Sequence, residues 1–170
     1  LKNCINNDLA NNFGNLCQRV FTFVKKNCDN KIPKANKLEA KDEKLLNNLK
    51  ENVKNLIAAM DKQNLNEYIK TVVGYSFDAN KYFNDSEPWS VKKKDPERMK
   101  SILFTILEQI KNLSILLNPI IPIATGKVLT SMNLSIDDIS IKSIINKNVL
   151  NHDKELKNLE ILFKKIENDN

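Results

Sequence analysis

Apolar residues recur along this chain every three or four positions, which is the spacing of one face of an α-helix, and strand-like alternation is nearly absent. The first such stretch follows Asn7 and Asp8, either of which can cap a helix. Its apolar stripe consists of Leu9, Phe13, Leu16, Val20 and Val24. The stripe ends in a polar, proline-containing segment, so the pattern predicts a helix followed by a loop.

Two further stretches show the same spacing. A second helix is expected from about Lys41, and the segment DKQNLN at 61–66 ends it. A third is expected from about Leu65 to Phe83. The inward positions are Leu45, Leu49, Val53, Leu56 and Met60 in the second helix, and Tyr68, Val72, Tyr75, Ala79 and Tyr82 in the third.

The next helix carries the strongest start signal in the chain, since Asp95 can cap it and Pro96 suits its first position. Its apolar residues are Met99, Ile102, Leu103, Ile106, Ile110, Leu113, Leu116 and Leu117. These cover two sides of the helix, which indicates a central place in a bundle. Pro119 and Pro122 then force a turn into a shorter helix that ends near Met132.

The remainder is less regular. Residues 131–148 are expected to be irregular or short-helical, and the tail resumes helical spacing at Leu156, Leu159, Phe163 and Ile166, although a short docked segment fits as well. The whole pattern predicts an all-α bundle of about five helices in a single domain over residues 1–170. Because the chain begins with leucine, we expect it to be a piece of a longer protein.

Charge and composition narrow the function only slightly. The 170 residues are 41% hydrophobic and 28% charged, as in ordinary globular domains. The net charge of +6 slightly favours a polyanionic partner such as nucleic acid over a general bias toward lysine and asparagine. With neither a membrane-spanning run nor a signal peptide in the sequence, we expect a cytoplasmic protein without a membrane partner.

Residues for catalysis or metal binding are scarce. Cys4, Cys17 and Cys28 lack C-x-x-C spacing and are interpreted as reduced thiols. The one histidine, His152, lies in a polar stretch and is interpreted as a surface residue. The sequence contains no phosphate-binding glycine motif and no nucleophile elbow. We therefore expect neither a catalytic residue nor a metal or cofactor site in this chain.

Two polar residues of the first expected helix are candidates for binding. Asn15 and Arg19 lie four positions apart on one face, about a quarter-turn from the apolar stripe. Only Arg19 and Arg98 are arginine among the 27 basic residues. An arginine in a lysine-rich chain can mark a need for the planar, multi-donor guanidinium, although an ordinary surface arginine is an equal alternative.

The only tryptophan, Trp89, lies in the stretch NDSEPWSVKKK, residues 84–94, which is expected to be a connecting loop. One interpretation is that its ring folds back and closes the end of the bundle. The other is an exposed ring beside Lys92, Lys93 and Lys94, which would stack on unpaired nucleotides while the lysines neutralise phosphates.

Four segments resemble one known family. Residues 6–19, NNDLANNFGNLCQR, resemble the N-x-D-L-x-N-x-x-G-N-L-x-x-R opening of the anticodon-binding domain of methionyl-tRNA synthetases. Residues 80–93, NKYFNDSEPWSVKK, resemble its N-x-Y…P-W-x-x-K segment. LNPIIP at 117–122 and LFKKIE at 162–167 are similar to its L-x-P-x-x-P turn and its closing L-F-P-R-I-E, but Lys164 and Lys165 depart from that closing pattern.

The resemblance implies an α-helical bundle that follows a catalytic nucleotide-binding domain in the same protein. That domain's H-I-G-H and K-M-S-K-S signatures are absent from this chain. In the family, the whole enzyme is a ligase that activates methionine with ATP and transfers it to tRNA(Met), and the bundle reads the CAU anticodon. ATP would therefore belong to the parent's catalytic domain and not to this chain.

The resemblance also gives roles to individual residues. Asn15 and Arg19 correspond to residues that contact anticodon bases, and Trp89 corresponds to the tryptophan that stacks on them. Pro88 would hold its loop in an extended conformation, and Lys92 or Lys93 would occupy the lysine position after the tryptophan. Such a site agrees with the way proteins read unstacked bases, by stacking and by hydrogen bonds to base edges.

Two other functions fit part of the pattern. The bundle could be a protein-interaction or assembly domain in which Trp89 is an interface hot spot. It could also be the anticodon bundle of a related class I synthetase, although the run at 6–19 argues against that.

Overall fold

The computed structural model describes residues 2–61, 64–135, 140, 142–145, 150 and 154–157, with the backbone alone for 2–8, 59, 142 and 145. Five helices of ten or more residues confirm the predicted bundle. They are α1 (Lys2–Asn27), α2 (Ala40–Asp61), α3 (Leu65–Ser86), α5 (Pro96–Leu117) and α6 (Pro122–Ser131). Two helices of four residues, α4 (Pro88–Val91) and α7 (Lys142–Ile145), complete the described set.

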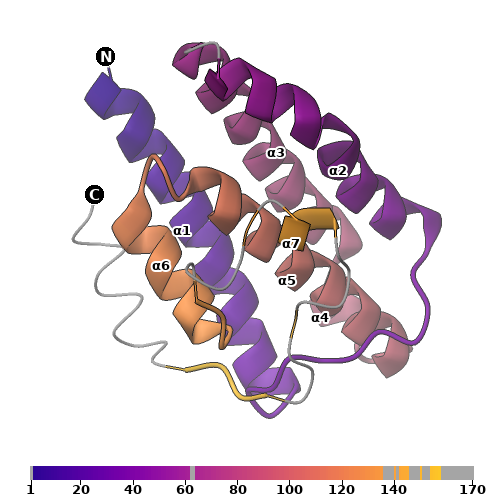
Figure 1. Ribbon diagram of the computed structural model, residues 1–170. Coiled ribbons are helices and arrows are strands. Elements are labelled where there is room, and N and C mark those ends of the chain that lie inside the picture. The colour runs from indigo at the N-terminus through magenta and orange to yellow at the C-terminus, as the bar shows by residue number, and fades with distance from the viewer. Residues whose placement is uncertain are drawn as a thin grey trace.

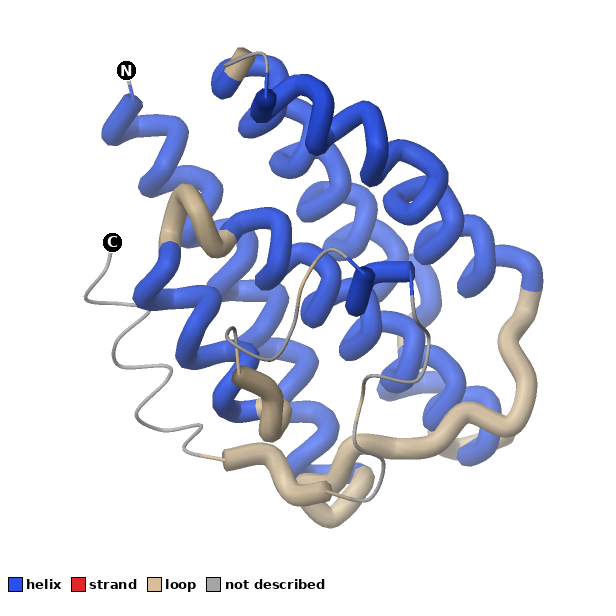
Figure 2. The backbone as a smooth tube through the Cα atoms, in the orientation of Figure 1, coloured by secondary structure: helices blue, strands red, loops and turns tan. Residues whose placement is uncertain are grey.

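The helices pack along one another rather than crossing steeply. Figure 1 shows α1 and α3 running in the same direction, while α2 and α5 run the opposite way. The long connection between α1 and α2 follows one end of the bundle (Figure 2). Within the described residues, extended pairing is limited to an isolated bridge between Lys31 and Glu155.

Helix α5 is the centre of the bundle, as the sequence predicted, and it contacts α1, α2, α3, α4, α6 and α7. Its start is the predicted one, because the Asp95 carboxylate accepts a hydrogen bond from the backbone N–H of Arg98 at 3.0 Å and Pro96 occupies the first turn. Buried hydroxyls on α5 are satisfied within the helix, since Thr105 and Ser114 donate to carbonyls one turn earlier, at 2.8 and 2.7 Å. These hydroxyls therefore add no unpaired polar group to the buried sides of the helix.

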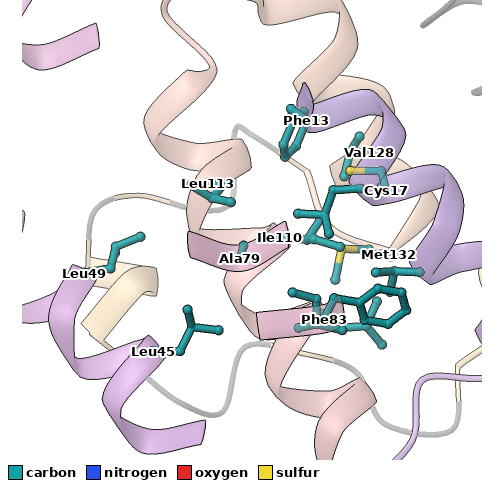
Figure 3. Close-up of a cluster of buried hydrophobic side chains, with 14 of the residues drawn as sticks. Phe13, Cys17, Leu45, Leu49, Ala79, Phe83, Ile110, Leu113, Val128 and Met132 are labelled. Atoms are coloured by element: carbon teal, nitrogen blue, oxygen red, sulfur yellow. The ribbon is translucent and has the colours of Figure 1, made fainter. Parts of the chain in front are cut away.

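The predicted apolar stripes form the core. Every position of the α1 stripe is buried, and so are the predicted positions of α2 and α3 except Met60 and Tyr75, which are half-buried. In Figure 3, Phe13 and Cys17 of α1 lie on one side of Ile110, with Val128 close by. Full burial of one such side chain stabilises the fold by about 1.5–3 kcal/mol.

One helix boundary was predicted wrongly. Helix α1 begins at Lys2, not at Asn7 or Asp8. Residues 2–6 contain neither proline nor glycine, and asparagine costs a helix interior only about 0.7 kcal/mol relative to alanine. A capping residue is therefore tolerated inside a helix when the chain before it can also be helical.

The C-terminal part reaches back to the end of α1. The N–H of Ile32 donates to the carbonyl of Lys154 at 3.1 Å, and the N–H of Leu156 donates to the carbonyl of Asn30 at 2.8 Å. Leu156 is buried, which fits a docked segment at this position. The other predicted tail positions, Leu159, Phe163, Ile166, Lys164 and Lys165, lie outside the described residues, as does His152.

The described part of the chain contains neither a candidate membrane-spanning helix nor a candidate metal-binding group. None of the helices described there combines the length and the apolar character needed to span a lipid bilayer. No group of three His, Cys, Asp or Glu side chains in that part could hold a metal ion. Cys17 and Cys28 are free thiols, and burial raises the pKa of each, which makes them poor nucleophiles.

Candidate nucleic-acid interface

Helix α1 presents Asn15 and Arg19 at its exposed edge next to α3. Both side chains are exposed, while Leu16 and Val20 beside them are fully buried. One turn earlier, Asn12 accepts hydrogen bonds from Ser76 at 2.6 Å and from Asn80 at 3.0 Å. The edge between α1 and α3 is therefore a polar seam above the apolar core.

Arg19 is held in place by two residues of α3. Its Nη2 donates to Oδ1 of Asn84 at 2.5 Å, and its Cζ lies 5.2 Å from the centroid of the Phe83 ring. Both partners are uncharged, so the contacts orient the guanidinium without neutralising it. Because a guanidinium carries five N–H donors, the others remain for a ligand.

Trp89 does not lie in a loop, and the prediction of a connecting loop there was wrong. Pro88 begins the short helix α4, and Trp89 is its second residue. The link from α3 is Glu87 alone, in the left-handed conformation at φ 46° and ψ 58°. One such residue ends α3 and lets α4 begin directly after it, so no longer connection is needed.

The extended conformation expected for Pro88 was also wrong. Pro88 is buried in the first turn of α4, and the N–H of Lys92 donates to its carbonyl at 3.0 Å. Proline fixes φ near the helical value and lacks only an N–H that the first turn leaves unpaired, so it favours a helix start here. Pro88 therefore positions Trp89 by starting a helix.

The Trp89 ring is partly exposed and not a buried plug. The residue is 37% exposed, and its ring meets the Phe83 ring edge-on, at a centroid distance of 5.7 Å and an interplanar angle of 75°. Phe83 itself is buried. The edge-to-face contact fixes the indole and leaves part of it open to solvent.

Phe83 therefore joins two residues that are far apart in sequence. Arg19 of α1 and Trp89 of α4 both contact this one ring of α3. Asn15 lies one turn before Arg19 on the same face of α1, and its side chain is exposed. The fold brings together an exposed amide, a guanidinium held by uncharged partners and a partly open indole.

The two candidate lysines differ. Nζ of Lys92 donates to Oδ1 of Asn27 at 3.0 Å and lies 5.8 Å from the centroid of Phe23, so it is turned toward the end of α1. Lys93 is exposed in the turn that follows α4. Lys92 forms the margin of the site, and Lys93 adds charge beyond it.

Sequence reasoning missed Phe83 and Asn84. Both lie inside the run at 80–93 that carries the family resemblance, one turn after Asn80. Their role depends on α1 lying beside α3, and a single sequence does not state which helices are neighbours. The available signal was their spacing from Trp89 within one motif.

Comparison with known proteins identifies the family. Residues 32–170 match the family model described as the anticodon binding domain of methionyl tRNA ligase. Over 170 residues the chain is 31% identical to a methionine–tRNA ligase of Rickettsia felis, covering 97% of the chain and 33% of that ligase. The ligase of Cytophaga hutchinsonii is 34% identical over 162 residues, covering 95% of the chain and 23% of the ligase.

Solved structures agree with this result. Apo methionyl-tRNA synthetase of Mycobacterium tuberculosis matches with a TM-score of 0.81 and 27% identity, over 91% of this chain and 32% of that one. The same synthetase in complex with methionyl-adenylate matches with a TM-score of 0.81 and 28% identity, over 91% of this chain and 31% of that one. The chain spans about a third of the length of the Rickettsia felis ligase and of these solved synthetases. It belongs to the family of anticodon-binding domains of methionyl-tRNA ligases.

Proposed function

We propose that this chain recognises the CAU anticodon of tRNA(Met) as the reading domain of a methionine–tRNA ligase. The observation that carries the proposal is the contact of Arg19 and Trp89 with the same Phe83 ring. Unpaired anticodon bases offer flat faces and open edges, and this arrangement supplies a partner for each.

The side chains have separate roles in this proposal. Trp89 stacks on a base, and Arg19 donates hydrogen bonds to base carbonyl oxygens. Asn15 can donate to and accept from a base edge, since its amide offers both groups. Pro88 sets the position of Trp89, while Lys92 and Lys93 add salt-dependent attraction to phosphates.

The rest of the reaction belongs to the parent enzyme. There, a catalytic domain joined in cis would activate methionine with ATP and transfer it to the tRNA. Support comes from the relatives, which are methionine–tRNA ligases, one of them solved in complex with methionyl-adenylate. That residues 1–170 form one domain that acts in the cytoplasm also remains a proposal. Neither alternative, a protein-interaction domain or the bundle of a different synthetase, gains support from these similarities.

Trp89 fluorescence tests the proposal, because Trp89 is the only tryptophan. An anticodon stem-loop carrying CAU should quench it, and a stem-loop with the first anticodon base changed should do so much more weakly. Measurements at low salt keep the electrostatic part of the affinity. An equal response to both stem-loops, or no response to either, would overturn the assignment.

A further inference from the structure

Phe77 is an exposed aromatic residue in the middle of α3. Phe77 is 56% exposed, whereas Trp89 is 37% exposed. Most large apolar side chains of α3 face the core, and Phe83 on the same helix is buried. Phe77 therefore contributes little to the core and offers a flat apolar face to solvent.

Its position relates it to the site described above. Phe77 and Asn84 are seven residues apart, which is close to two helical turns, so they share one stripe of α3 about 10 Å apart. Its neighbours Ser76 and Asn80 bind Asn12 of α1. The surface that carries Arg19 and Asn84 therefore continues along α3 to Phe77.

The surroundings of Phe77 are open and carry charges of both signs, since the adjacent Asp78 is exposed. Lys81 and Lys70 are exposed on the same side, one turn after Phe77 and two turns before it. Gly74 lies one turn before Phe77, and a Cβ atom added there would meet nothing within 4 Å. An aromatic face with open space beside it and lysines before and after it along the helix is a combination that can bind unpaired nucleotides.

We propose that Phe77 is a second stacking platform, which binds an unpaired loop nucleotide outside the anticodon triplet. The separation of about 10 Å from Asn84 equals about three stacked bases at a rise of 3.4 Å, so one continuous loop reaches both places. The inference rests on the proposed function: a loop nucleotide is assigned to Phe77 because the surface around Phe77 continues the one that carries Arg19. A protein partner is disfavoured because polar and charged residues, rather than an apolar patch, surround the ring.

The test measures binding of anticodon stem-loops to the whole 170-residue chain by fluorescence anisotropy of labelled RNA. Phe77→Ala should weaken binding of the CAU loop about fivefold to a hundredfold, and Phe77→Tyr should retain it. The preference for CAU over a changed first base should survive in Phe77→Ala. Ile123→Ala is the matched control, since Ile123 is 61% exposed on α6, and it should bind like the parent chain.

Stem-loops with one abasic loop nucleotide identify the occupant. Removing the proposed base should weaken binding to the parent chain and leave binding to Phe77→Ala unchanged. If Trp89→Ala weakens binding while Phe77→Ala stays within twofold of the parent chain, the second platform is wrong and the anticodon assignment stands. If the unsubstituted 170-residue chain binds no anticodon stem-loop at low salt, the proposed function fails and this inference fails with it.

Discussion

The two arginines of the chain occupy opposite environments. Arg98 is 11% exposed and donates to both oxygens of Asp42, at 2.5 and 2.9 Å. Arg19 is exposed and is held only by the uncharged Asn84 and Phe83. The same type of side chain is a structural tie in one place and, in the proposed function, a ligand-binding group in the other.

The partner decides this difference. Asp42 is fully buried and also accepts hydrogen bonds from the Tyr82 hydroxyl at 2.5 Å and from the backbone N–H of Glu39 at 2.9 Å. Its carboxylate neutralises Arg98 and ties α2, α3 and α5 together. An amide cannot neutralise Arg19, so its charge remains for an anionic ligand.

The largest effect is expected at the buried pair. Arg98→Met should lower the free energy of unfolding by about 3 kcal/mol, because it leaves the Asp42 carboxylate buried without its cation. Urea unfolding followed by circular dichroism measures this. Lys100→Met is the control, since Lys100 lies on the same helix with a side chain that is 43% exposed, and it should change stability by less than about 0.5 kcal/mol. Equal losses from both variants would remove the distinction between the two arginines.

Arg19→Ala should weaken RNA binding and leave stability nearly unchanged, whereas Arg98→Met mainly lowers stability. Binding of the CAU stem-loop should weaken by about 1–3 kcal/mol, because a group that donates to base edges is lost. Stability should change by less than about 0.5 kcal/mol, as for other surface residues. Titration of the RNA and thermal unfolding of the same samples separate the two quantities, and Gln18→Ala on the neighbouring exposed position is the control. A large loss of stability would show that Arg19 is also structural.

Of the two arginine sites, only the buried one should respond to acid. Burial raises the pKa of Asp42, but hydrogen bonds from Arg98, Tyr82 and the Glu39 backbone outweigh it and hold the pKa below the usual 3.8. Since the folded-state pKa is the lower one, this stabilisation is complete above about pH 4 and is lost as the pH falls further, by at most about 1.4 kcal/mol per pH unit. Urea unfolding at a series of pH values from about 2 to about 6 should show that the free energy of unfolding depends less steeply on pH in Asp42→Asn than in the unsubstituted chain. An unchanged slope in that variant would contradict the assignment.

The smallest of these expected effects is at Gly74, which serves as a reference position away from both arginines. Gly74 lies inside α3, and a Cβ atom there would meet nothing within 4 Å. Gly74→Ala should raise the free energy of unfolding by about 0.5–1 kcal/mol, because alanine loses less backbone freedom on folding. Thermal unfolding measures it, and a loss of stability would mean that this surface is less open than described.

The sequence predicted the elements better than the contacts between them. The stripe from Leu9 to Val24 and the Asp95-Pro96 start were confirmed, because helical spacing and caps act over one or two turns. Trp89 was misplaced in a loop because a single left-handed residue, Glu87, replaces the expected connection. Nothing in a local pattern shows that one residue is enough to connect the two helices.

The site was predicted only in part. Asn15, Arg19 and Trp89 were proposed from residue chemistry and family resemblance, but the ring that joins two of them was not. Phe83 fits the apolar pattern of α3 and looks like any core residue until α1 and α4 are known to lie on either side of it. Contacts between distant helices are set by packing, which one sequence does not reveal.

The most direct test of the account is a double-mutant cycle on Arg19 and Trp89, measured as binding of the CAU anticodon stem-loop. If both side chains serve one reading site joined by Phe83, the effects of Arg19→Ala and Trp89→Ala should not add, and the coupling should be about 0.5–3 kcal/mol. Losses that add within about 0.3 kcal/mol, or a double variant that binds as well as the parent chain, would contradict a shared anticodon site.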